Sequence, residues 1–447
     1  MCSIVMAVVI APRVRARLSA DVVVLGLEGA LVGLAIVVGA LRNHRGVGLH
    51  ADAAPLFATW GPHVGWGTPA AVLVAAVVIG WGVPWARRAP WSAVLAVGWV
   101  AAVCWTLSLS MVDGWSAGLA ERLTAQAEYL TEVPRVTDVG ALLAGFADRI
   151  LDFQPGSWST HTAGHPPGAL LLFVLLDRVG LGGGTAAGLA CVLIGATVAV
   201  SVPVTLRALG SPDAARTAVP FLVLLPGAVW IGASADGIFA AVVAAGVALL
   251  VSRRLAVAAA GGLLLGLALY LSYGFVLVGL LALAAVASRA ARRGAVLLAA
   301  FGGVSVVVAV FTLAGFAWWE GYQLVVQRYY QGWAAERPYA YWVWANIAAL
   351  VLSAGPVAGP ALCRALAALR LRRLPPPTVL FPVAAALAIA VADLSGMSKA
   401  EVERIWLPFA VWLLPAVALL PPHTRRWWLM GQALTALAVN HLLWTVS

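Results

Sequence analysis

Long apolar runs recur from one end of this 447-residue chain to the other. Runs of roughly 17–25 residues are long enough to cross the hydrocarbon core of a bilayer as helices. A membrane-spanning β-strand would alternate in hydrophobicity, and these runs do not alternate. Only 10% of the residues are charged, whereas a water-soluble domain carries roughly a quarter. The sequence therefore predicts an all-α polytopic membrane protein of about 12–14 transmembrane helices, with one transmembrane domain and no separate soluble domain.

Basic residues form short clusters between the apolar runs. Because cytoplasmic loops of membrane proteins carry the excess of Arg and Lys, this pattern predicts the topology, with a cytoplasmic N-terminus. The net charge of +10 therefore reports membrane orientation, and no nucleic-acid partner is expected. The clusters are Arg13/Arg15/Arg17, Arg87/Arg88, Arg253/Arg254, Arg289/Arg292/Arg293, Arg370/Arg372/Arg373 and Arg425/Arg426.

The longest polar interruption is a loop over residues 112–165, predicted to lie on the non-cytoplasmic face. It begins at Asp113, directly after an apolar run, and closes with the segment WSTHTAGHPPG at 158–168. The spacing of Trp115 and the leucines in 113–130 predicts an amphipathic helix in the plane of the membrane interface, and 139–153 predicts a second. Chains this apolar have short loops, so a loop of this length indicates a functional role.

The order of spans places a set of polar side chains at the same, outer face. Charged groups at the ends of spans that face one aqueous vestibule are functional candidates in a membrane protein. The set is Asp113, His165, Asp236, Arg328, Lys399, Glu401, Glu403 and Arg404. Residues 166–206 leave two alternatives open. Two full crossings would put Arg207 and Arg216 outside, against the charge rule, whereas one broken crossing or a re-entrant element would keep them inside.

Several other polar residues are interpreted as solvated. His44, His50, Asp52 and His63 share a loop, but their spacing matches no compact metal site. Glu336 and Arg337, like Arg328, are read first as loop charges. The four cysteines show neither a metal-binding nor a disulfide pattern. No cofactor is predicted, and a divalent metal stays an alternative without a supporting motif.

The basic residues are almost all arginine. Of the 28 Lys and Arg residues, a single one, Lys399, is lysine. Together with heavy use of Ala and Gly, this suggests a high-GC genome, as in actinobacteria. A lone Lys is either chance or a place where a compact ammonium group is needed.

Four segments carry a family resemblance. They are Asp113 at the junction of a span and the long loop, GHPPGALLLF at 164–173, SADGIFAAVVAAGVALL at 234–250 and VERIWLPFAVWLLPAVALL at 402–420. In these segments the chain resembles the GT-C superfamily of integral-membrane glycosyltransferases, most closely the group with protein O-mannosyltransferases and lipid A aminoarabinose transferases. It departs from that pattern in having one acid at the loop start, His165 in place of a Lys before Pro-Pro, and two spans before the loop.

The resemblance implies transfer of a sugar from a polyprenyl-phosphate donor to a hydroxyl acceptor on a lipid, glycan or protein of the cell envelope, with inversion. By resemblance Asp113 is the general base, and Arg404, His165 and Lys399 bind the donor phosphate. The residues expected to orient the acceptor or support the reacting groups are Asp236, Glu403, Tyr273 and Arg328. Two alternatives stay open: a transporter or flippase of lipid-linked saccharides, and a non-catalytic subunit.

Overall fold

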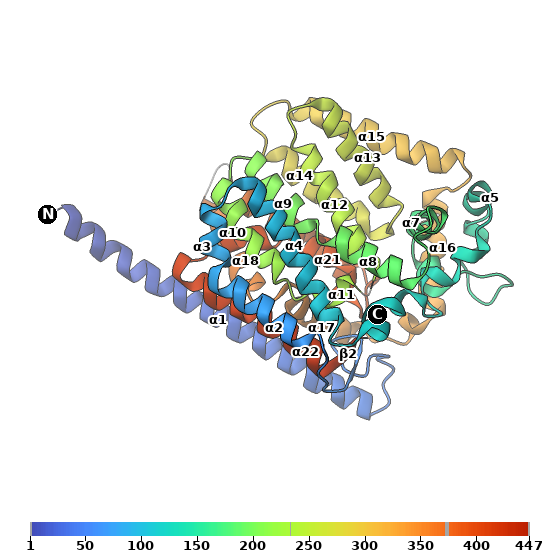
Figure 1. Cartoon of the computed structure of the whole chain (residues 1–447), viewed down its shortest axis with the longest axis horizontal. Helices are drawn as coiled ribbons and strands as arrows, with labels where there is room; N and C mark the ends of the chain where they lie inside the picture. Colours follow the sequence, from blue (N-terminus) through green and yellow to red (C-terminus); the bar gives the residue numbers. More distant parts are fainter. Residues whose placement is uncertain (1, 233, 372–374, 446–447) are drawn as a thin grey trace.

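The computed structural model describes residues 2–232, 234–371 and 375–445, with side chains from residue 20 onward, so Arg372 and Arg373 lie outside it. Helices form most of the described structure (Figure 1). Six stretches are long and apolar enough to cross a membrane. They are α1 (Cys2–His44, apolar from Ala20), α2–α3 (Thr68–Val77 and Val83–Arg88), α4 (Trp91–Ser110), α8–α9 (Gly184–Gly195 and Val198–Ala208), α15 (Arg293–Leu313) and α19 (Pro377–Leu394). The prediction of an all-α polytopic membrane protein is confirmed.

The spans are fewer and less regular than the expected 12–14. In the described residues, α17 (Tyr339–Ala354) and α18 (Ala358–Leu371) form one further candidate span that bends by 102°. The bend lies in the segment GPVAGP, at Gly355, whose φ of 88° suits glycine. Other predicted spans are shorter apolar helices: α12 (Asp236–Leu250), α13 (Leu255–Leu269), η7–α14 (Tyr273–Leu277 and Val278–Ala287) and α21–η9 (Leu407–Ala410 and Leu414–Leu419).

The remaining elements complete the bundle and its outer end. They are α5 (Val139–Ala144), α6 (Thr160–Gly164), α7 (Pro167–Arg178), α10 (Pro212–Val223), α11 (Ala228–Ile231), α16 (Trp318–Gln331), α20 (Val402–Ile405) and α22 (Arg425–Leu442). A two-stranded antiparallel ribbon pairs β1 (Ala58–Trp60) with β2 (Leu443–Thr445). Helix α12 packs against α13, α9, α8 and α21, which places it at the centre of the fold. Helix α1 runs along one edge, and its N-terminal part projects beyond the other helices (Figure 1).

The structure decides between the alternatives for residues 166–206. Helix α7 is not among the candidate spans and packs on the long loop: its Phe173 stacks on Tyr129, and Arg178 at its end donates to the Thr137 carbonyl. Helices α8 and α9 then form one crossing. At its far end Arg207 lies 4.6 Å above the ring of Trp91, and Arg216 donates to the Ala86 carbonyl at 2.5 Å. The crossing is therefore single, and both arginines lie at the Arg87/Arg88 end.

The outer loop differs from the expected pair of helices. Residues 114–135 form short π- and 3₁₀-turns, and the regular part of the second segment is only α5. A continuous helix would turn Leu123 and Glu128 about 140° apart. In the structure both side chains are buried, so a regular helix is interrupted and both side chains point inward. Gly118 lets the loop approach α4 closely, because a Cβ there would lie 1.8 Å from the Ser110 carbonyl oxygen.

We predict that the end with the long loop faces the cell exterior. In a variant without native cysteines, a membrane-impermeant maleimide should label Gln154→Cys in intact cells, because residue 154 is exposed in the loop. Arg253→Cys, exposed at the opposite end, should react only after permeabilisation. Labelling in the reverse order would invert the topology and contradict an extracellular site.

Candidate active site at the outer end of the bundle

Arg404 is the centre of a buried cluster of charged side chains. It comes from α20 and donates to Asp236 Oδ2 at 3.0 Å and to Glu401 Oε2 at 2.6 Å. The Arg404 side chain is 5% exposed and Asp236 is 6% exposed. Burial alone would lower the pKa of Arg404, but Glu401 and Asp236 outweigh it and raise the pKa. The cluster thus joins the start of α12 to the segment before α21.

His161 connects this cluster to the outer loop. Its Nε2 lies 3.2 Å from Arg404 Nη2, and its Nδ1 lies 2.7 Å from Glu128 Oε1. Glu128 is buried, with 5% of its surface exposed. His165 follows one helical turn later, and its Nδ1 is 2.8 Å from the His161 carbonyl oxygen. The loop end WSTHTAGHPP therefore contributes two imidazoles to the site.

Arg337 extends the cluster on its other side. It donates to Glu401 Oε1 at 3.3 Å and to the Lys399 carbonyl at 2.8 Å. Burial would raise the pKa of Glu401, but Arg404 and Arg337 hold it at about 2. The expectation that Arg337 is a solvated loop charge is wrong, because its side chain is 6% exposed. Glu336 is exposed as expected and lies 2.7 Å from His50.

Backbone strain fixes the segment that carries Glu401. Ala400 and Glu401 have φ values of 71° and 62°, in the left-handed region that non-glycine residues rarely adopt. Asn346 holds this turn through contacts with the Ser398 carbonyl at 2.6 Å and the Ala400 amide at 3.3 Å. The turn directs the Glu401 carboxylate towards Arg337 and Arg404. The strained backbone therefore serves to position this carboxylate.

Asp113 lies in a second network. Its Oδ1 lies 2.8 Å from His63 Nε2 and accepts from Asn440 Nδ2 at 3.3 Å, and its Oδ2 accepts from Arg122 at 2.9 Å. Arg122 also bonds Thr445 of β2. The expectation that His63 lies in a solvated loop is wrong, because its side chain is 12% exposed.

The two networks are electrostatically connected through Arg122. Burial lowers the pKa of Arg122, and the nearby carboxylates of Asp113 and then Glu128 oppose that effect. Because Glu128 pairs with His161, a line of charged groups runs from Asp113 to Arg404 beneath the outer loop.

The structure does not bring Lys399 to Arg404. Its Nζ donates to the Ala334 carbonyl at 2.9 Å and lies 5.3 Å from the centroid of the Tyr330 ring. The expectation that Lys399 and Arg404 bind the same phosphate required their side chains to converge. Instead the turn at Ala400 and Glu401 sends the two cations apart.

Three other predicted residues lie outside the Arg404 cluster or at its edge. Arg328 pairs with Asp152 at 2.6 Å, and Tyr273 packs against Trp318 with ring centroids 5.4 Å apart. Glu403 faces the early loop, where its Oε1 accepts from the Phe57 amide at 2.8 Å. Burial raises the pKa of Glu403 to about 7.

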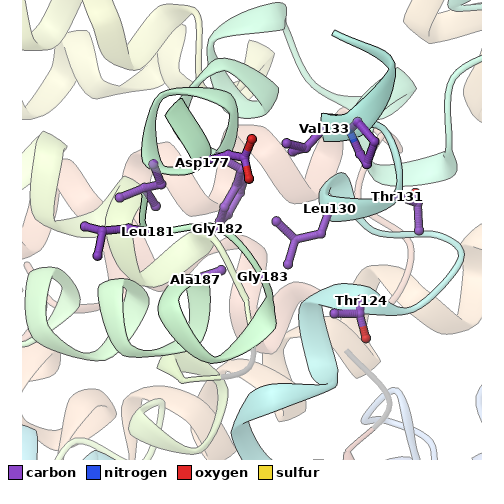
Figure 2. A pocket seen from close by; sticks show the side chains of 12 residues that line it. Thr124, Leu130, Thr131, Val133, Asp177, Leu181, Gly182, Gly183 and Ala187 are labelled. Carbon is purple, nitrogen blue, oxygen red and sulfur yellow. The ribbon is translucent and has the colours of Figure 1, made fainter. Parts of the chain in front are cut away.

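A cavity of about 230 Å³ lies between the long loop, α7 and the start of α8 (Figure 2). Leu130, Val133 and Leu176 supply much of its apolar wall, and Asp177 is its one ionisable lining residue. Phe173, also in the wall, stacks on Tyr129 at 5.3 Å. Because its charged group is a carboxylate, this cavity is unsuited to a phosphate.

Sequence reasoning missed Glu128, His161, Arg122, His63 and Arg337. The first four lie in the two loops already noted, but their periodicity and spacing carried no sign that they would be buried. In the described residues, no group of three His, Cys, Asp or Glu side chains is placed to hold a metal ion. The fold and site together define a polytopic helical membrane protein with a buried acid–base centre at one end of its bundle.

Comparisons with known proteins extend this description. No family model and no curated protein sequence match the chain. ArnT from Cupriavidus metallidurans in the apo state is similar in fold, at 18% identity and a TM-score of 0.46, over 74% of this chain and 61% of that one. An Archaeoglobus fulgidus oligosaccharyltransferase, solved with Zn and sulfate, is similar at 12% identity and a TM-score of 0.43, over 78% and 53%.

Both neighbours are GT-C membrane glycosyltransferases. Both similarities are likenesses of fold. This chain spans between about half and three-fifths of their lengths.

We predict that Arg404→Ala destabilises the folded protein by about 3–5 kcal/mol, because it leaves Asp236 and Glu401 buried without their shared cation. Thermal unfolding in detergent measures this. Adding Asp236→Asn and Glu401→Gln should recover part of the loss. If Arg404→Ala alone unfolds like wild type, the cluster does not stabilise the fold.

We also predict that stability falls as pH rises from about 4.5 to 7, in part because of Glu403. Its pKa is raised in the folded state to about 7 from 4.5, so the folded protein holds a proton that the unfolded chain releases. The contribution is complete below pH 4.5 and lost above 7, at most ~3 kcal/mol. Glu403→Gln should flatten this slope in unfolding measured at several pH values. Exposed Glu336→Gln is the control, and equal slopes in both variants would contradict the assignment.

Proposed function

We propose that the protein is a membrane glycosyltransferase. It moves a sugar from a polyprenyl-phosphate donor to a hydroxyl acceptor at the outer face, with inversion at the anomeric carbon. The supporting observation is the buried acid–base cluster around Arg404, built from four chain segments at one end of a helical membrane bundle. Transfer to a hydroxyl needs a group that takes a proton and cations that stabilise a departing phosphate.

Lys399 is the best-placed cation for the donor phosphate. Its side chain is 9% exposed, and it has no carboxylate partner in the described part of the chain. Its ammonium group has three N–H donors, of which one is used by the Ala334 carbonyl. Burial and the nearby Arg337 lower its pKa, so an anion bound there would relieve an electrostatic cost.

Arg404 has a different role in this proposal. Asp236 and Glu401 already neutralise it, so it offers little net charge to a phosphate. Its buried Nε has no hydrogen-bond partner among the described residues, and that donor remains for a ligand oxygen. Arg404 therefore mainly fixes the geometry of the site, and Lys399 supplies the attraction.

The transporter alternative is less well supported. A carrier site is typically formed near the membrane midplane, at broken helices with unpaired charges. The described structure has a broken pair, α17–α18, and acids on α1 near it. Asp21 pairs with Arg364 at 2.6 Å, and Glu28 accepts from the Gly359 amide at 3.0 Å. Both contacts fasten α1 to α18, which is a structural use of these acids.

We predict that Lys399→Met weakens donor binding roughly 10–100-fold, the loss expected for one hydrogen bond to a charged group. Lys399→Arg should retain most of the affinity because it keeps the charge. The measurement is isothermal titration of a polyprenyl-phosphate sugar into detergent-solubilised protein, with transfer to acceptor followed separately. Arg253→Met, exposed at the opposite end, is the control. Unchanged affinity in Lys399→Met would place the phosphate elsewhere, and absence of transfer by wild type would favour a transporter or a non-catalytic subunit.

A further inference from the structure

We infer that His165 Nε2 takes the acceptor's proton, in place of Asp113. This inference rests on the proposed glycosyltransferase function and names the general base of the same site. The sequence resemblance assigned His165 to the donor phosphate, a role that needs a hydrogen-bond donor or a positive charge.

The hydrogen bonding of His165 fixes which ring nitrogen is free. Nδ1 lies 2.8 Å from the His161 carbonyl oxygen, which accepts hydrogen bonds only, so Nδ1 carries the hydrogen. In the neutral ring Nε2 then has a lone pair and no hydrogen. Nε2 has no hydrogen-bond partner within the described residues, and the ring is half-buried. A neutral ring in this tautomer accepts a proton at Nε2 and cannot donate to a phosphate there.

Aromatic packing holds the imidazole in place. Tyr129 meets it edge-on and Phe239 lies tilted beside it, each with ring centroids 5.8 Å away. Pro166 and Pro167 follow directly and start α7, which fixes the backbone beyond the ring. A base held this firmly loses little entropy when an acceptor approaches.

The surrounding charges suit a base that is ready over the physiological pH range. Burial lowers the pKa of His165 to about 4; Asp236 and the hydrogen bond to the His161 carbonyl oppose the shift, and the charges of His161 and Arg404 add to it. The ring is therefore neutral at pH 7, and its basicity matches that of an ordinary carboxylate. The Asp236 carboxylate would stabilise the imidazolium that forms after proton transfer.

Asp113 is less available for this role. Both of its oxygens accept hydrogen bonds, and one of the donors is the Arg122 guanidinium. Its side chain is 5% exposed. Accepting a further proton would break the pairing with Arg122 and leave a buried cation without its partner. Asp113 instead positions Arg122, and through it the loop start and β2.

The transfer step balances with these groups. The acceptor oxygen forms a bond to the anomeric carbon while its proton moves to His165 Nε2. The bond from that carbon to the phosphate oxygen breaks, and its electron pair stays on the departing polyprenyl phosphate beside Lys399. The imidazolium then returns its proton to water or to the released phosphate. No oxidant, reductant or further reactant is required.

His165→Ala provides the test, with Asp113→Asn and the exposed, remote His423→Ala as comparison variants. In purified protein with a polyprenyl-phosphate sugar, His165→Ala should lower kcat about 10²–10⁴-fold while donor affinity stays within about threefold. Added imidazole should restore part of the kcat, an effect that a purely structural role for His165 would not give. Wild-type kcat should be level from about pH 6 to 8 and fall towards pH 4.

Each outcome is decisive. Near-normal kcat in His165→Ala overturns the inference, as does a loss that imidazole does not restore in protein with wild-type thermal stability. If His165→Ala loses stability, His165→Asn takes its place, because the amide preserves the size and polarity of the side chain, and the same criterion applies to its kcat. A loss of 10²-fold or more in Asp113→Asn, with His165→Ala active, returns the role of base to Asp113. Absence of transfer by wild-type protein instead contradicts the proposed function.

Discussion

The ion pairs of Arg404 with Asp236 and Glu401 are the interaction on which the long-loop end of this protein depends. Removing three charged groups from water costs several kcal/mol for each ion, and only close mutual contact offsets that cost. Contact at 2.6 and 3.0 Å requires the start of α12 and the turn before α20 to meet. His161 adds the end of the outer loop to the same point. The loop is thus fastened to the bundle by charge rather than by apolar packing alone.

A second fastening explains why Asp113 lies where it does. Asp113 ends the α4 region, and its partners come from the first outer loop, from the long loop and from α22. Arg122 also donates hydrogen bonds to Thr445 of β2, and β2 pairs with β1. The Asp113 carboxylate therefore links the start of the long loop to this two-stranded ribbon. Trp444 of β2 stacks on His63 at 3.9 Å and covers this network. Both ends of the long loop are therefore held by buried carboxylates.

Much of the fold could be predicted from hydrophobic runs and basic clusters, because bilayer thickness and the charge rule act on local sequence. The order of spans predicted Asp236, Arg404 and His165 at one face. In the structure Asp236 pairs with Arg404, and His161, whose carbonyl oxygen lies 2.8 Å from His165 Nδ1, contacts Arg404 as well. What stayed hidden depends on contacts between distant segments. Helical periodicity does not predict the irregular turns that bury Glu128 together with Leu123. The local sequence around Arg337 does not predict its ion pair with Glu401, which lies 64 residues further along the chain. Lys399 and Arg404 point apart because Ala400 and Glu401 adopt left-handed backbone conformations, which these residue types rarely adopt and the sequence therefore does not predict.

The distribution of charge in the site bears on the two tasks of the proposed reaction, phosphate binding and proton transfer. Around Arg404 and Arg337 lie Glu401, Asp236 and Glu128, so this centre has no excess positive charge while its histidines are neutral. A phosphate would be repelled there as much as attracted. Lys399 stands on the far side of Arg337 and lacks a carboxylate partner among the described residues. In the proposed reaction the anion is therefore bound at Lys399, and the proton moves to the neutral imidazole of His165. Keeping the two apart limits the influence of the phosphate's negative charge on His165, where that charge would raise the pKa of the imidazole and favour its protonation before the acceptor reacts.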